Sequence, residues 1–199
     1  MKTPRSALAS ELLSCPRMKW MGLGLAAWML MGCLVPQDQN YLSERPIPRN
    51  RPPRILETQV QPSERIIRGY GLDRCELEFH AIVEDPDMAD KLYTYWYVDY
   101  DPTDTRGADS QRSLEPTNNK TVRDERATFS SRVNSSNFNR LNIPGDHVVE
   151  LVVSDRTLID GREPEPTVHR LPDGTDVLDP GYATTYVWFV RTEVGGDCR

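Results

Sequence analysis

Near the N-terminus, a run of 13 residues from Trp20 to Gly32 carries no charge. The run is too short to cross a bilayer as a helix, which needs about 20 apolar residues. It has the length of the hydrophobic region of a secretory signal peptide, and Arg17 and Lys19 precede it as the positively charged region does in such peptides. The sequence therefore predicts that residues 1–32 are a signal peptide that is removed.

The run ends in Leu30-Met31-Gly32-Cys33, which resembles the lipobox of bacterial lipoproteins. In that motif a small residue precedes the cleaved bond, and the thiol of the next cysteine accepts diacylglycerol. The resemblance implies cleavage between Gly32 and Cys33, lipidation of Cys33, and attachment to a membrane through the lipid. The competing tetrad at Leu12-Leu13-Ser14-Cys15 follows no apolar run, so we set it aside.

The residue after the lipidated cysteine bears on where such a protein resides. In Gram-negative bacteria an aspartate at this position retains a lipoprotein in the inner membrane, and this chain has Leu34 instead. The resemblance thus implies a location in the bacterial cell envelope, anchored by lipid in the outer membrane rather than the inner membrane.

Residues 33–62 have the composition of a spacer, with the alternative that its end, Ile55 to Val60, already forms the first strand of the domain. Proline removes backbone donors and favours extended polyproline geometry, so we expect this segment to be semi-rigid. Its arginines are predicted to be solvated, or alternatively to bind anionic head groups. The prolines are Pro36, Pro46, Pro48, Pro52, Pro53 and Pro62, and the arginines are Arg45, Arg49, Arg51 and Arg54.

The rest of the chain, residues 63–199, has the pattern of an all-β domain. In residues 75–84, apolar Leu77 and Phe79 alternate with charged or polar neighbours, as in a strand with one buried face. Several short strands joined by turn-rich segments favour a β-sandwich. Further strands are predicted at residues 91–99, 127–133, 147–155 and 184–192, and long loops at residues 101–125 and 156–182.

Three segments resemble the PKD-type domain, an immunoglobulin-like β-sandwich family. They are Ala81 to Asp85, Tyr95-Trp96, and the run PGDHVVELVVSD at residues 144–155. The run departs from the family pattern at His147, where tyrosine is usual, and the 156–182 segment is longer than in the family. The resemblance implies an immunoglobulin-like (PKD-like) β-sandwich and a binding or spacing role at a cell surface.

Two cysteines, Cys75 and Cys198, are left when Cys15 is removed with the signal peptide and Cys33 is lipidated. Two thiols in an oxidising compartment predict a disulfide, with two free thiols as the alternative. The immunoglobulin-like resemblance supports the disulfide, because it implies that the strand starting at Cys75 and the strand ending before Cys198 meet at one end of the sandwich.

Two groups of residues are candidates for ligand binding. Asp85, Asp87 and Asp90 share one acidic turn and are weak candidates for calcium ligands, with solvated turn-forming aspartates as the alternative. Tyr93, Tyr95 and Tyr97 share one strand face, which predicts either a row that stacks on sugars or on a protein, or a face that packs under a neighbouring loop.

Nothing in the sequence indicates catalysis. The three histidines, His80, His147 and His169, lie far apart, and the chain has no nucleophile elbow, zinc-type histidine pair or phosphate-binding glycine loop. The net charge of -6 argues against nucleic acid as a partner. We therefore expect no enzyme and no cofactor, but an envelope lipoprotein whose domain has a structural role or binds an envelope protein or polysaccharide. The alternative is a calcium- or carbohydrate-dependent recognition module.

Overall fold

The computed structural model describes residues 50–198 except 118, 134, 136–138, 160 and 172. The predicted signal peptide, Gly32 and Cys33 lie outside these residues, as does the spacer up to residue 49. Strands account for 49% of the structure and helix for 4%, which confirms the all-β class. Among the described residues, no helix is long and apolar enough to cross a membrane.

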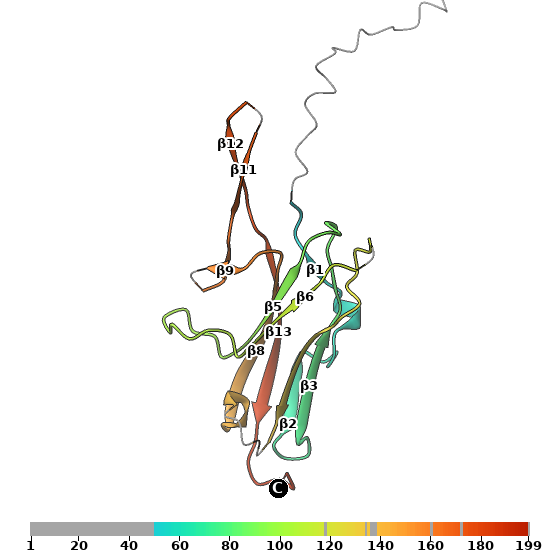
Figure 1. The fold of residues 1–199 in the computed structure, drawn as a ribbon. Helices are drawn as coiled ribbons and strands as arrows, with labels where there is room; N and C mark the ends of the chain where they lie inside the picture. The colour runs from blue at the N-terminus through green and yellow to red at the C-terminus, as the bar shows by residue number, and fades with distance from the viewer. Residues whose placement is uncertain are drawn as a thin grey trace, which may run out of the picture. The chain divides into compact units, whose positions relative to one another are not determined.

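The larger sheet has five strands, and its longest members, β8 and β13, lie side by side (Figure 1). Neighbours run antiparallel except at one edge, where β2 runs parallel to β13. In sheet order the strands are β2 (Ile66–Tyr70), β13 (Ala183–Thr192), β8 (Gly145–Ser154), β5 (Leu92–Val98) and β6 (Ser110–Leu114).

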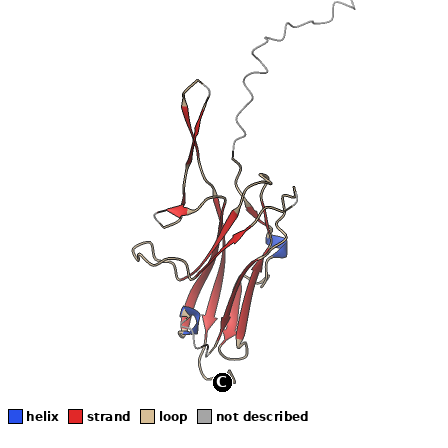
Figure 2. Cartoon of the chain, in the orientation of Figure 1, coloured by secondary structure: helices blue, strands red, loops and turns tan. Residues whose placement is uncertain are grey.

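The smaller layer is built around the antiparallel pair β3 (Glu76–Ala81) and β7 (Ala127–Arg132). The continuation of β3, β4 (Val83–Glu84), pairs with the short first strand β1 (Arg54–Ile55). The only helical turns among the described residues are the 3-10 turns η1 (Glu57–Gln59) and η2 (Arg140–Asn142), so strands dominate throughout (Figure 2).

The core lies between the two layers and is rich in aromatic side chains. The predicted alternation in β3 holds, since Leu77, Phe79 and Ala81 are buried with outward-facing residues between them. Phe79 meets Trp188 edge-on at 5.1 Å between ring centroids, and Trp96 stacks on Trp188 at 5.7 Å. Side chains of both layers thus interdigitate as in a β-sandwich.

The end of the predicted spacer belongs to the domain. Val60 is buried in the core, Gln61 bridges to His80, and Ile55 pairs with Val83. Prolines are compatible with a short edge strand because they lack only the backbone donor that an edge leaves free. The fold therefore begins before residue 63, within the compact unit Pro48–Arg199.

The two predicted long loops contain strands. Residues 101–125 include β6, and residues 156–182 contain two hairpins that the sequence pattern does not indicate. The two strands of the second hairpin are largely exposed on both faces, so their residues do not show the alternation of apolar and polar side chains that predicts a strand. The hairpins pair β9 (Leu158–Ile159) with β10 (Glu163–Pro164), and β11 (Thr167–Arg170) with β12 (Asp176–Asp179).

The structure contains the predicted disulfide between Cys75 and Cys198, whose Cα atoms are 5.2 Å apart. Cys75 precedes β3, and Cys198 follows β13. The two chain segments approach closely here, because Asp197 N–H donates to the carbonyl of Leu72 and a Cβ on Gly196 would collide with the Leu72 backbone. The bridge closes one end of the sandwich, while β1 pairs at the other end of the β3–β4 strand.

Candidate functional site

The tyrosine row is mostly covered: Tyr95 and Tyr97 are buried, and Tyr93 is partly buried and packs against their cluster. Tyr95 and Tyr97 are 5% and 3% exposed, and they form a second apolar cluster with Val152. Leu158, from β9, packs on this cluster, and its backbone N–H donates to the Tyr95 hydroxyl at 3.3 Å. The structure therefore has the alternative arrangement, in which the row packs under a loop and does not form an open stacking platform.

Arg162 holds this covering loop on the sheet. Its guanidinium lies 3.7 Å from the ring centroid of Tyr100 and 4.9 Å from that of Tyr97, both cation–π distances. It also donates to Glu150 at 2.5 Å. The sequence does not predict this role, because an arginine in a turn-rich segment carries no local signal of its aromatic partners.

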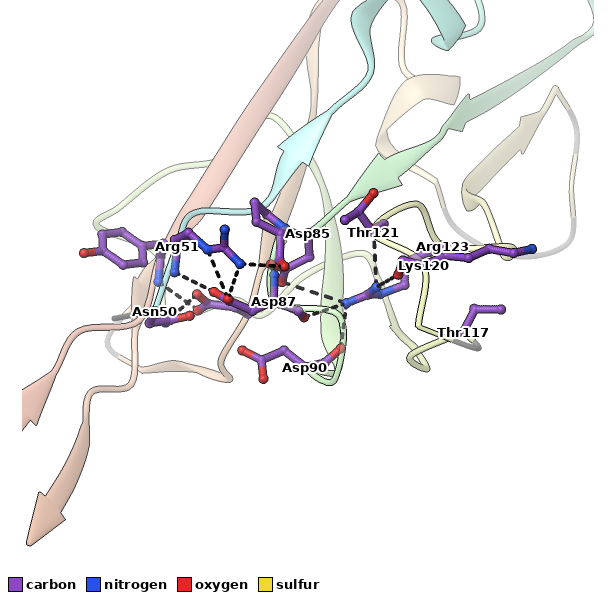
Figure 3. A network of polar contacts seen from close by, with 12 residues as sticks. Asn50, Arg51, Asp85, Asp87, Asp90, Thr117, Lys120, Thr121 and Arg123 are labelled. Carbon is purple, nitrogen blue, oxygen red and sulfur yellow. Dashed lines mark hydrogen bonds and ion pairs between the residues drawn. The ribbon is translucent and has the colours of Figure 1, made fainter. Parts of the chain in front are cut away.

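The acidic turn that follows β4 is organised by a buried arginine. The side chains of Asp85 and Arg123 are both fully buried, and Arg123 Nη2 lies 3.9 Å from Asp85 Oδ2, too far for a hydrogen bond. Arg123 instead donates to backbone carbonyls, at 2.8 Å to Asp90 and at 3.2 Å to Lys120. Arg123 and Arg51 approach the turn from opposite sides (Figure 3).

The burial of Asp85 changes its acidity. Burial raises the pKa of the carboxyl to about 6, against an ordinary value of 3.8. The N–H of Asp87 hydrogen-bonds the carboxylate at 2.8 Å and lowers the pKa, the charges of Asp87 and Asp90 raise it, and Arg123 lowers it least. The pKa of Asp85 is therefore determined more by the loss of water on burial than by attraction to Arg123.

The same turn receives the chain where it enters the domain. Arg51 donates its backbone N–H to Asp87 Oδ2 at 2.7 Å and its Nη2 to Asp87 Oδ1 at 2.8 Å. Asn50 Nδ2 donates to Asp155 at 2.7 Å and to the carbonyl of Pro180 at 3.0 Å. We call these five residues the junction, because they attach the end of the proline-rich segment to two separate loops of the domain.

Asp155 is the buried carboxylate of the junction. Burial raises the pKa of its carboxyl, while hydrogen bonds from the Tyr182 N–H and from Asn50 lower it. One carboxylate thus ties the incoming chain to the segment just before β13. The junction lies at the β1 end of the sandwich, away from the disulfide.

The candidate calcium ligands are engaged with cations. Asp85 faces Arg123, Asp87 binds Arg51, and Asp90 lies 3.8 Å from Arg156. Within residues 50–198, outside the gaps named above, no three acidic, histidine or cysteine side chains gather as a metal site. The turn serves in this structure as an attachment point for arginines.

The three histidines lie in separate surroundings. His147 is nearly buried, with Nδ1 at 2.6 Å from Asp99 Oδ2 and Nε2 at 2.6 Å from the carbonyl of Ile143. It therefore holds the corner where β8 begins, a packing role. His80 and His169 are more exposed and lie beside Glu78 and Asp179 respectively.

The structure is a β-sandwich-like domain closed by a disulfide, and its junction binds the end of the preceding proline-rich segment. No family model matches the sequence, and neither a curated protein nor a solved structure matches it.

Proposed function

We propose that this chain is a lipid-anchored protein of the bacterial cell envelope that displays an immunoglobulin-like domain for a binding or structural role. One observation carries the proposal: the uncharged run Trp20 to Gly32 leads directly into Cys33 at the position of a lipobox cysteine. The cationic residues before the run and the spacer after it are in the order that such an anchor requires.

Two features of the structure support this proposal. The Cys75–Cys198 disulfide suits an oxidising compartment outside the cytoplasm. The junction holds Asn50 and Arg51 against the domain, so an anchor placed upstream would connect to a defined point on the sandwich rather than to a frayed end.

The strand arrangement supports the immunoglobulin-like part of the proposal. A sheet in the order β2-β13-β8-β5-β6 faces the β3–β7 pair, and the first segment contributes to both layers through β1 and β2. The PKD-like alternative within this class is supported by the PGDHVVELVVSD run, which forms β8 and its entering turn. The partner we propose is an envelope protein or polysaccharide, and Leu34 after the anchor favours the outer membrane.

Metabolic labelling tests the anchor. The full-length chain is produced in a Gram-negative host with radioactive palmitate, together with a Cys33→Ala variant and a matched Cys15→Ala control. We expect label on the wild-type chain and on Cys15→Ala, and none on Cys33→Ala, which should also keep its leader and run larger on a gel. Unchanged labelling of Cys33→Ala would contradict the proposed anchor.

A further inference from the structure

The outer face of the five-stranded sheet has a covered half and a bare half. Tyr97 and its neighbours form the covered half, beneath the loop that Arg162 holds in place. The bare half lies over β2 and β13, where the side chains of Ile66 and Phe189 are 64% and 52% exposed. The fold thus protects one set of apolar side chains on this face and leaves another in contact with water.

The strand register gathers the bare side chains into one patch. Phe189 lies beside Ile66 on β2 and beside Val148 on β8, and Arg191 lies beside Asp146 in the next row, with an ion pair at 2.8 Å. An open groove of about 500 Å³ runs along these residues. We call the following set the β2–β13 patch: Ile66, Arg68, Asp146, Val148, Phe189 and Arg191.

Charge distinguishes the patch from the rest of the chain. Residues 33–199 carry 20 lysines and arginines against 29 acidic residues, a net charge of -9. Around the groove, Arg68 and Arg191 are matched by Asp146 and Glu193, so the lining is neutral overall. Two copies of an acidic chain repel each other over most of their surfaces, and a neutral apolar patch is where they can approach.

The order of the strands makes the patch complementary to itself. β13 lies between β2, which carries Arg68, and β8, which carries Asp146. A two-fold axis that runs along β13 places β2 of each copy over β8 of the other. Arg68 of one copy then faces Asp146 of the other, and the two Phe189 rings meet near the axis, as an isologous interface requires.

We propose that two copies of this chain associate through the β2–β13 patch, face to face about such a two-fold axis. The contact has an apolar centre at Ile66 and Phe189 and a charged rim, the usual anatomy of a protein interface. This pairing does not depend on the lipid anchor, so the sedimentation test below and the labelling test above can fail separately.

Sedimentation equilibrium over about 1 to 500 μM measures the association. Residues 48–199 form one compact unit that contains the entire described core, so this segment is studied beside the longer segment 34–199. We expect a monomer–dimer equilibrium in both. Phe189→Ser should raise the dissociation constant by at least about tenfold, because truncating a central anchor removes a hot spot.

Matched variants separate the patch from exposed apolar surface in general. Leu178→Ser removes a side chain of 62% exposure from the β11–β12 hairpin and should leave the dissociation constant within about twofold. Arg68→Glu should weaken the dimer, and Asp146→Arg in the same chain should restore it, since the two positions face each other across the axis. Circular dichroism before each run checks that every variant is folded.

Three results would overturn the proposal. The first is a wild-type chain that stays monomeric at the highest concentration. The second is a dimer that Phe189→Ser leaves unchanged. The third is a dimer of 48–199 that disappears in 34–199, which would mean that the preceding segment occupies the patch.

Discussion

The buried Asp85 carboxyl makes the domain's stability depend on pH in the direction opposite to that of an ordinary ion pair. Its pKa is about 6 in the folded chain against 3.8 for an unperturbed aspartate, so the folded state binds the proton more tightly than the unfolded state. The stabilisation from protonated Asp85 is therefore fully present below about pH 4 and is lost as the pH rises through 6. Arg123, buried beside it, attracts the charged form too weakly to reverse this order.

The size of the effect follows from the two pKa values. The raised pKa of Asp85 lowers the free energy of unfolding at pH 7 by about 3 kcal/mol relative to the protonated carboxyl, and roughly 1 kcal/mol of this returns at pH 5. Asp85→Asn keeps an oxygen to accept the Asp87 N–H but cannot ionise. Relative to this variant, the wild-type domain should gain roughly 1 kcal/mol between pH 7 and pH 5.

Urea unfolding of both chains at half-unit pH steps measures the difference, followed by tryptophan fluorescence because Trp96 and Trp188 are buried. Asp124→Asn, at an exposed aspartate paired with Lys120, serves as the matched control and should give a flat difference. A wild-type chain that loses stability relative to Asp85→Asn on acidification would refute the reasoning, because it would show that attraction to Arg123 outweighs burial.

Three further changes should have measurable effects. Removing the disulfide with Cys75→Ser and Cys198→Ser should lower the free energy of unfolding by about 5 kcal/mol, since the bridge spans 123 residues; a loss in urea unfolding under 1 kcal/mol would contradict the loop-entropy account. Arg162→Ala should cost about 1–2 kcal/mol and speed amide exchange in β9, and unaltered exchange would show that the loop is held without it. Asp87→Ala should speed tryptic cleavage after Arg54 about fivefold, whereas an unchanged rate would show that the junction does not restrain the chain.

Strands with one buried face were predictable from the sequence because their side chains alternate between core and solvent. Leu77 and Phe79 in β3, and Val149, Leu151 and Val153 in β8, carry this signal directly. The disulfide was predictable as well, because the proposed removal of Cys15 and lipidation of Cys33 leave two cysteines, and the resemblance to immunoglobulin-like domains implies that these meet at one end.

The organisation of the polar residues was not predictable from the sequence. Asp85 and Asp87 look alike in an acidic turn, yet one is buried beside Arg123 and the other binds Arg51, a difference set by segments more than 30 residues away. Tyr95 and Tyr97 share a face, but whether that face is open depends on a loop that Arg162 attaches. Such contacts arise from tertiary packing between distant segments, so the local alternation of apolar and polar residues does not predict them.

The position of the disulfide determines how the domain yields to a pull on its N-terminal side. Only residues 50–74 lie between the junction and Cys75, and everything from Cys75 to Cys198 is enclosed by the covalent bond. A pull that breaks the junction and then peels β1 and β2 from their sheets releases roughly 25 residues, or about 85 Å of extended chain. When the opposing load acts after Cys198, the domain therefore has a built-in limit of extension, because further load passes through the sulfur–sulfur bond and the enclosed strands are spared.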